Sequence, residues 1–129
     1  MVIHKNFADF VLFLYIHMAH ADKEFHETEM AMVREKMKKL YPEGTDYEAK
    51  LKEALILYQD FDKSKLHTLF RDTFRQFSDV KFSVKYHIYT DLYEIINADG
   101  KIDESETDAL NTLKEIIDIS HWVATYSYI

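Results

Sequence analysis

The sequence contains no cysteine, one proline and only two glycines among its 129 residues. Without cysteine the chain cannot form disulfides, thiolate metal sites or a thiol nucleophile, and this fits the reducing cytoplasm. Because proline and glycine are the residues that most often interrupt helices, their scarcity favours long helices. The apolar run from Phe10 to Met18 is too short to span a bilayer, and no basic n-region or cleavage site accompanies it. We therefore expect a soluble, unexported, cytoplasmic protein.

What is present is a strong 3.6-residue periodicity of apolar side chains, which predicts one all-α domain over residues 1–129. We expect a bundle of six or seven helices, with its clearest loop at Pro42 and Gly44. The fifth helix is expected to be the longest and to bury most of its aromatic residues. The first helix is expected at about His4 to His20 and the second at about Glu27 to Leu40. The third is expected to begin after Thr45 or Asp46, and the fourth after Asp62 or Ser64. The fifth is expected to run from Ser78 or Asp79 to Ile96. The last two are expected from Asp103 and from Ser120. The inward residues of the fifth helix are predicted to be Phe82, Tyr86, Ile88, Tyr89, Leu92, Tyr93 and Ile96.

A stretch of nine residues occurs twice, at 21–29 and, 77 residues further along, at 98–106. The first copy reads ADKEFHETE and the second ADGKIDESE, so that Ala, Asp and two Glu recur and Ser replaces Thr. Each copy falls between two predicted helices. The repeat therefore predicts two pseudo-symmetric helix-turn-helix units.

Each copy places an Asp at the end of one helix and a Glu seven residues later, in the first turn of the next. These pairs are Asp22 with Glu29 and Asp99 with Glu106. If the two units pack about a pseudo-twofold axis, the four carboxylates meet, and their repulsion raises their pKa values unless a cation neutralises them. A cluster of oxygen ligands suits Ca²⁺ first and Mg²⁺ second.

Helix capping offers a simpler role for one member of this set. Asp103 at an N-cap followed by Glu106 has the spacing of a capping box. The first copy has His26 at the position of Asp103, so capping explains Glu29 less well. Asp103 is a further candidate ligand, and His20 beside the first turn could make cation binding depend on pH.

Histidines near the first turn offer a different metal site. His17 and His20 share a helix face and His26 lies just beyond the turn, so a nickel, copper or zinc site is conceivable. Histidines on amphipathic helices are more often surface or hydrogen-bonded residues. We keep this site as the weaker alternative.

With these turns placed between helices, the chain resembles the TerB-like family, all-helical domains named for a tellurite-resistance protein. The resemblance rests on Ala98-Asp99-Gly100, Ile102 and Glu106, with Lys23 replacing the usual glycine in the first copy. It implies a divalent-cation site at the acidic turns, with Asp22, Glu29, Asp99 and Glu106 as the ligands. It further implies a link to stress response and to membrane-associated complexes through a partner, without enzymatic activity.

The distribution of charge gives the alternative function. The formal net charge is −7, and nine of the acids lie between Asp91 and Asp118. Such a surface disfavours nucleic acid, whose phosphates need a dense basic face. Since the catalytic motifs that we sought are missing, we expect a non-enzymatic cation-binding, sensing or interaction module. The alternative is a metal-independent domain whose acidic face, 91–118, docks on a basic protein partner.

Overall fold

The computed structural model of the chain describes residues 2–20, 27–77, 79–98, 107 and 109–111. The helices in chain order are α1 (Phe7–Ala19), α2 (Glu27–Leu40), α3 (Tyr47–Asp60), the short 3₁₀ helix η1 (Lys63–Lys65), α4 (Leu66–Gln76) and α5 (Phe82–Ile96). No strand occurs within the described ranges, so the predicted all-α class is confirmed. The pseudo-symmetry of two units stays a prediction. Across the same ranges, the helices are too short or too polar to cross a membrane.

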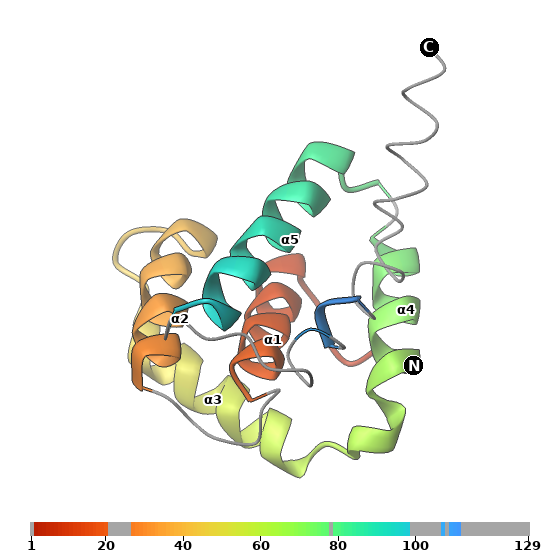
Figure 1. Ribbon diagram of the computed structural model, residues 1–129, viewed down its shortest axis with the longest axis horizontal. Coiled ribbons are helices and arrows are strands. Elements are labelled where there is room, and N and C mark those ends of the chain that lie inside the picture. The colour runs from red at the N-terminus through yellow and green to blue at the C-terminus, as the bar shows by residue number, and fades with distance from the viewer. Residues whose placement is uncertain (1, 21–26, 78, 99–106, 108, 112–129) are drawn as a thin grey trace.

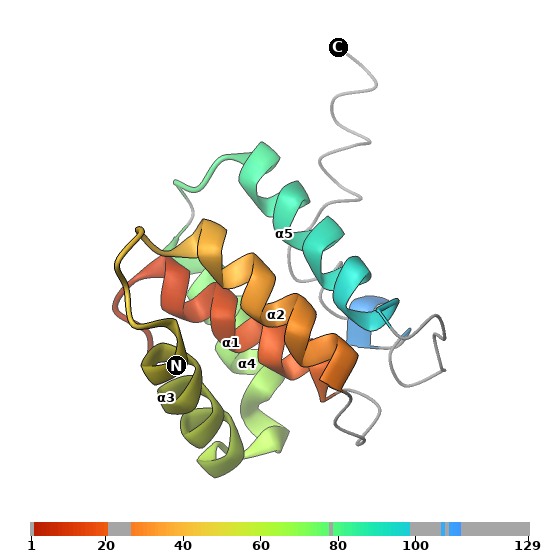
Figure 2. The ribbon, with the colours of Figure 1, turned by 90° about the vertical axis from the view of Figure 1, so that its left-hand side faces the viewer.

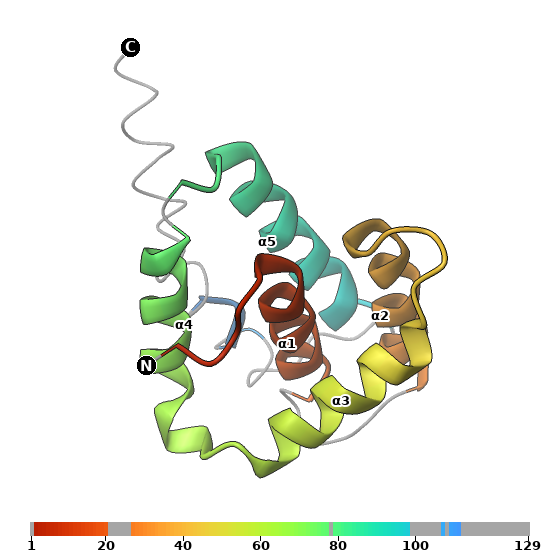
Figure 3. The same cartoon turned by 180° about the vertical axis from the view of Figure 1, so that it is seen from behind.

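α1 is the central helix of the bundle, and the other four α-helices surround it (Figures 1 and 3). It packs against α2, α3 and α5, and the ring of Phe10 contacts Phe70 and Phe74 of α4. Nine of its thirteen residues are buried, among them the whole run Phe10 to Ile16. A helix that is apolar all round belongs in the middle of a core, which explains why this run is the most hydrophobic in the chain.

Two of the α-helices, α1 and α3, begin at side-chain caps within the described residues, and Asp62 caps η1 by accepting from the N–H of Ser64 at 3.0 Å. Asn6 accepts a hydrogen bond from the backbone N–H of Asp9 at 2.9 Å, so α1 begins at Phe7 and not near His4 as predicted. Asp46 accepts one from the N–H of Ala49 at 3.1 Å, which confirms it as the cap of α3. Gly44, in the loop before it, has a φ of 91°, a conformation that glycine adopts without strain.

α5 differs from its prediction in two ways. It begins at Phe82 with Lys81 as the N-cap, rather than at Ser78 or Asp79. Tyr86 and Tyr93, predicted to be buried, are 49% and 46% exposed, because the inward face of α5 carries other residues. That face is formed by Ile88, Asp91, Leu92, Ile95 and Ile96.

Candidate cation-binding end of the bundle

The C-terminal ends of α1 and α5 and the N-terminal end of α2 lie together at one end of the bundle (Figures 1 and 2). The three helices pack against one another in pairs, with α2 antiparallel to α5. Both acidic stretches join the bundle here, since the first connects α1 to α2 and the second follows α5. The helix ends that flank the two copies of the repeat therefore lie at the same end of the molecule.

Of the four carboxylates predicted to bind the cation, Glu29 is the one that the structure describes. Asp22, Asp99 and Glu106, together with the weaker candidate Asp103, lie outside the described residues. Glu29 is the third residue of α2 and is completely buried, with 0% of its surface exposed. Burial of a carboxylate is costly unless hydrogen bonds or positive charge compensate it. A buried Glu at this end therefore fits the chemistry of a cation ligand.

The position of Glu29 in α2 also gives it a helix-initiating role. It lies in the first turn, where the positive end of the helix dipole favours a negative charge. It occupies the third position of the helix, the position from which a capping-box Glu reaches back to the N-cap. Here the residue before the helix is His26, which lies outside the described residues. Capping and cation binding are compatible uses of one carboxylate with two oxygens.

His20 forms the C-cap of α1, two residues before Asp22. Its Nδ1 lies 2.9 Å from the carbonyl oxygen of Ile16, so this nitrogen donates and carries the proton. The ring packs 5.3 Å from that of Tyr58 in α3. These contacts hold the ring in one orientation beside the end of α1.

His17 is committed to a structural contact. Its Nδ1 lies 3.0 Å from the Tyr58 hydroxyl, and its ring packs 5.1 Å from Phe70. Burial, followed by the nearby charges of His20 and Lys63, lowers the pKa of His17 to about 4. Across the described part of the chain no group of three or more His, Asp or Glu side chains is placed to hold a metal. The third member of the predicted histidine site, His26, lies outside that part, and the site stays a prediction.

A buried polar network joins the three helices of the candidate end. The Tyr15 hydroxyl of α1 donates to Asp91 of α5 at 2.7 Å. Lys36 of α2 donates to Asp91 at 2.8 Å and to Glu94 at 2.5 Å. Lys36 and Asp91 are each only 6% exposed. The network therefore fixes α2 and α5 against α1 through charge-assisted hydrogen bonds.

The pKa values of this network follow its contacts. Burial acts to lower the pKa of Lys36, but its hydrogen bonds to Asp91 and Glu94 outweigh burial and raise the pKa above its usual value. Burial and then the hydrogen bond to Asp91 raise the pKa of Tyr15. Lys36 is therefore charged and Tyr15 neutral at physiological pH.

The sequence analysis missed this network and assigned Asp91 to an exposed acidic face. Asp91 is buried, so it does not contribute to the proposed face 91–118, most of which lies outside the described residues. A pattern in the sequence could have revealed the network. Lys36 lies three residues after Val33 and Asp91 three after Ile88, so both charges fall on the apolar faces of their helices.

The comparisons with known proteins agree with this architecture. A family model described as tellurite resistance protein TerB matches residues 8–124, nearly the whole chain. Neither a curated protein sequence nor a solved structure matches the chain.

Proposed function

This chain belongs to the TerB family, and we propose that it binds a divalent cation, with Ca²⁺ preferred over Mg²⁺, as a non-enzymatic sensing or interaction module. The proposed ligands are Asp22 and Glu29 from the first acidic turn and Asp99 and Glu106 from the second. The observation that carries the proposal is the complete burial of Glu29 at the end where α1, α2 and α5 meet.

Connectivity supports the choice of the other proposed ligands. Asp22 follows two residues after His20, the C-cap of α1, and Asp99 directly follows Ala98, just beyond α5. Carboxylates that converge on one point repel one another, and a hard cation with flexible coordination offsets that repulsion. The donor set contains only oxygen atoms, which Ca²⁺ and Mg²⁺ prefer.

The mechanism that we propose is electrostatic. A bound cation joins the turn between α1 and α2 to the turn after α5, and so stabilises one angle between these helices. The surface that a protein partner recognises then depends on whether the cation is present. A role of this kind in a response to tellurite or other stress is part of the same proposal.

Thermal unfolding tests the proposal. Chelator-treated protein is titrated with Ca²⁺, Mg²⁺, Mn²⁺ and Zn²⁺ in separate experiments. A site that binds only the folded state adds about 2.7 kcal/mol of stability when the free ion is at 100 times its dissociation constant. We expect a saturable rise in melting temperature with Ca²⁺ and a smaller one with Mg²⁺. No rise with any ion would overturn the proposal and favour the metal-independent acidic face, whereas a rise with Zn²⁺ alone would favour the histidine site.

Three variants locate the site. Glu29→Gln and the double change Asp22→Asn with Asp99→Asn should each remove the rise caused by Ca²⁺. Glu35→Gln is the matched control, because Glu35 lies on the same helix and its side chain is 69% exposed. A Ca²⁺ response that survives the double change would place the cation elsewhere.

A further inference from the structure

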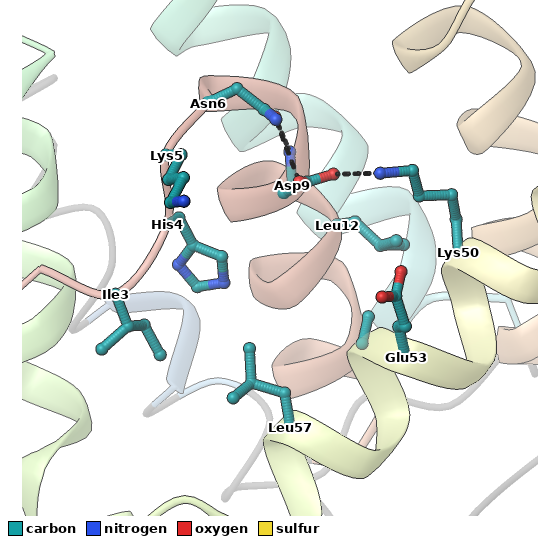
Figure 4. Close-up of a pocket in the computed structure, with 10 residues that line it drawn as sticks. Ile3, His4, Lys5, Asn6, Asp9, Leu12, Lys50, Glu53 and Leu57 are labelled. Atoms are coloured by element: carbon teal, nitrogen blue, oxygen red, sulfur yellow. Dashed lines mark hydrogen bonds and ion pairs between the residues drawn. The ribbon is translucent and has the colours of Figure 1, made fainter.

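A second region with the features of a ligand site lies at the opposite end of α1. A cavity of about 430 Å³ opens between the segment preceding α1, the first turns of α1, and α3 (Figure 4). Its lining includes Ile3, His4, Leu12, Lys50, Ala54 and Leu57. Cavities of this size commonly hold small organic molecules. Because it lies at the start of α1, it is separate from the acidic turns.

His4 is the polar group at the inner side of this cavity, toward which its ring points in Figure 4. The side chain is only 7% exposed and packs 5.1 Å from the ring of Phe13. Its Nδ1 has no hydrogen-bond partner within the described part of the chain. Burial lowers the pKa of His4 more than the charge of Asp9 raises it, so the imidazole is neutral at physiological pH. A buried nitrogen without a partner is unfavourable and is usually explained by a bound water or ligand.

Two lysines, Lys5 and Lys50, and two carboxylates, Asp9 and Glu53, line the cavity, so binding of a negatively charged ligand depends on how far each carboxylate is already compensated. Asp9 is already satisfied, because it accepts hydrogen bonds from Tyr41 at 2.5 Å and Asn6 at 3.0 Å and pairs with Lys50 at 3.5 Å. The Lys50 ammonium group also lies 5.5 Å from the centre of the Tyr41 ring. Because an ammonium group has three N–H donors, Lys50 keeps a donor for a further acceptor beside Asp9. Lys5 adds a second positive charge and Glu53 a negative one. The positive end of the α1 dipole adds to the attraction for an anion.

The rest of the cavity is apolar. Its apolar lining comes from Leu12 of α1 and from Ala54 and Leu57 of α3. Ile3 and Leu57 line the cavity and are 39% and 38% exposed, so they add apolar surface that a ligand can cover. A ligand that covers them must itself carry an apolar part.

We propose that this cavity binds a small amphipathic carboxylate. Its carboxylate group pairs with Lys50 and Lys5 beside His4, and its hydrocarbon part packs on Leu12, Ala54 and Leu57. No step of this proposal depends on the cation site.

The test is a nuclear magnetic resonance titration of the ¹⁵N-labelled full chain with sodium octanoate. We expect saturable shifts of amide signals confined to residues 3–12 and 50–57. Titrations with 1-octanol and octylamine measure the contribution of the carboxylate, and we expect both to bind at least about tenfold more weakly, equivalent to about 1.4 kcal/mol. Equal affinity for octanol would overturn the assigned head-group contact. Shifts that do not saturate, or that lie elsewhere, would overturn the site itself.

Variants separate the two parts of the ligand. Lys50→Gln should weaken octanoate binding about tenfold and leave octanol binding unchanged. Its matched control is Lys52→Gln, an exposed position on the same helix, which should change neither. Ala54→Leu should block both ligands by filling the cavity. If Lys50→Gln and Lys52→Gln weaken octanoate equally, general attraction between charges explains the binding and the proposal fails.

Discussion

The two sides of α1 are packed by different physical means. Toward α3 and α4, Phe10 and Phe13 lie against aromatic rings, with Phe10 5.1 Å from Phe74 and Phe13 5.4 Å from Tyr58. Toward α2 and α5, apolar packing surrounds the buried network in which Asp91 accepts from Tyr15 and Lys36. The side of α1 toward α3 and α4 is thus stabilised by close packing of apolar surface. The side toward α2 and α5 is also stabilised by directional, charge-assisted hydrogen bonds.

This difference has a consequence for function. Apolar packing is tolerant of small shifts, because the hydrophobic effect depends on area and not on direction. A buried Lys–Asp pair is stable only with good geometry, so it favours one arrangement of α2 and α5. These are the helices that lead to the acidic turns. We therefore expect the network to set the geometry of the candidate cation-binding end, and the aromatic side to supply most of the stability.

The largest expected effect is on the aromatic side. Phe10→Ala removes a ring that is completely buried, and such changes cost about 3–5 kcal/mol in the free energy of unfolding. Urea denaturation at low and high salt should give the same loss, because no charge is involved. Ile56→Ala, at a position that is 50% exposed, is the control and should cost less than about 1 kcal/mol. A loss at Phe10 as small as the control's would show that this side contributes little.

Breaking the charged network should cost about 3 kcal/mol. Lys36→Met removes the buried cation beside Asp91 and leaves Tyr15 and, at 3.4 Å, the ring of His87 as its partners. Removal of one member of a buried pair costs about 3–5 kcal/mol. Because Tyr15 still donates to Asp91, we expect the lower value.

The double change Lys36→Met with Asp91→Leu sharpens this result. It removes both charges, so the double variant should be more stable than Lys36→Met alone. The control is Lys38→Met, whose ion pair with Glu35 is exposed and contributes little. A double variant that is less stable than either single variant would mean that packing, and not charge, dominates at this position.

A matched pair of hydroxyl deletions compares the two sides directly. Tyr15 and Tyr58 are 2% and 6% exposed, so Phe fits equally well at both positions. Tyr15→Phe removes a hydrogen bond to a charged carboxylate, worth about 1.5–3 kcal/mol, whereas Tyr58→Phe removes one to a neutral imidazole, worth about 0.5–1.5 kcal/mol. Equal losses in urea denaturation at neutral pH would remove the distinction between the two sides.

Much of the fold could be predicted from local chemistry. The bounds of α2, the cap at Asp46 and the turn at Gly44 depend on residues close in sequence, and the structure has them as predicted. The predicted core face of α5 included too many residues, because a sequence pattern counts Tyr86 and Tyr93 as apolar in the same way as their buried neighbours. Which aromatic residue is buried depends on the helix that packs beside it, and periodicity does not contain this information.

The candidate site could be predicted only in part. The repeat singled out Glu29, which the structure shows completely buried in the first turn of α2, as predicted for its position in the helix. The link between Tyr15 and Asp91 spans 76 residues, and no local rule predicts such a contact. Sequence reasoning assigned Tyr15 to the apolar core and Asp91 to the surface, since each assignment is the common one for its residue type.

The smallest effect on stability at neutral pH is expected for His17, a titratable residue on the aromatic side of α1. Burial lowers the pKa of His17 to about 4, whereas in the unfolded chain it is about 6.5. The unfolded state therefore binds a proton that the folded state rejects, and this contribution to stability is lost as the pH falls from about 6.5 to about 4. His17→Gln should reduce the slope of stability against pH in this range. His4, whose pKa is also lowered, will keep part of the slope, and the exposed control His67→Gln should not change it. If His17→Gln leaves the slope intact, the pKa of His17 does not differ between the folded and unfolded states, and its burial does not contribute to the pH dependence.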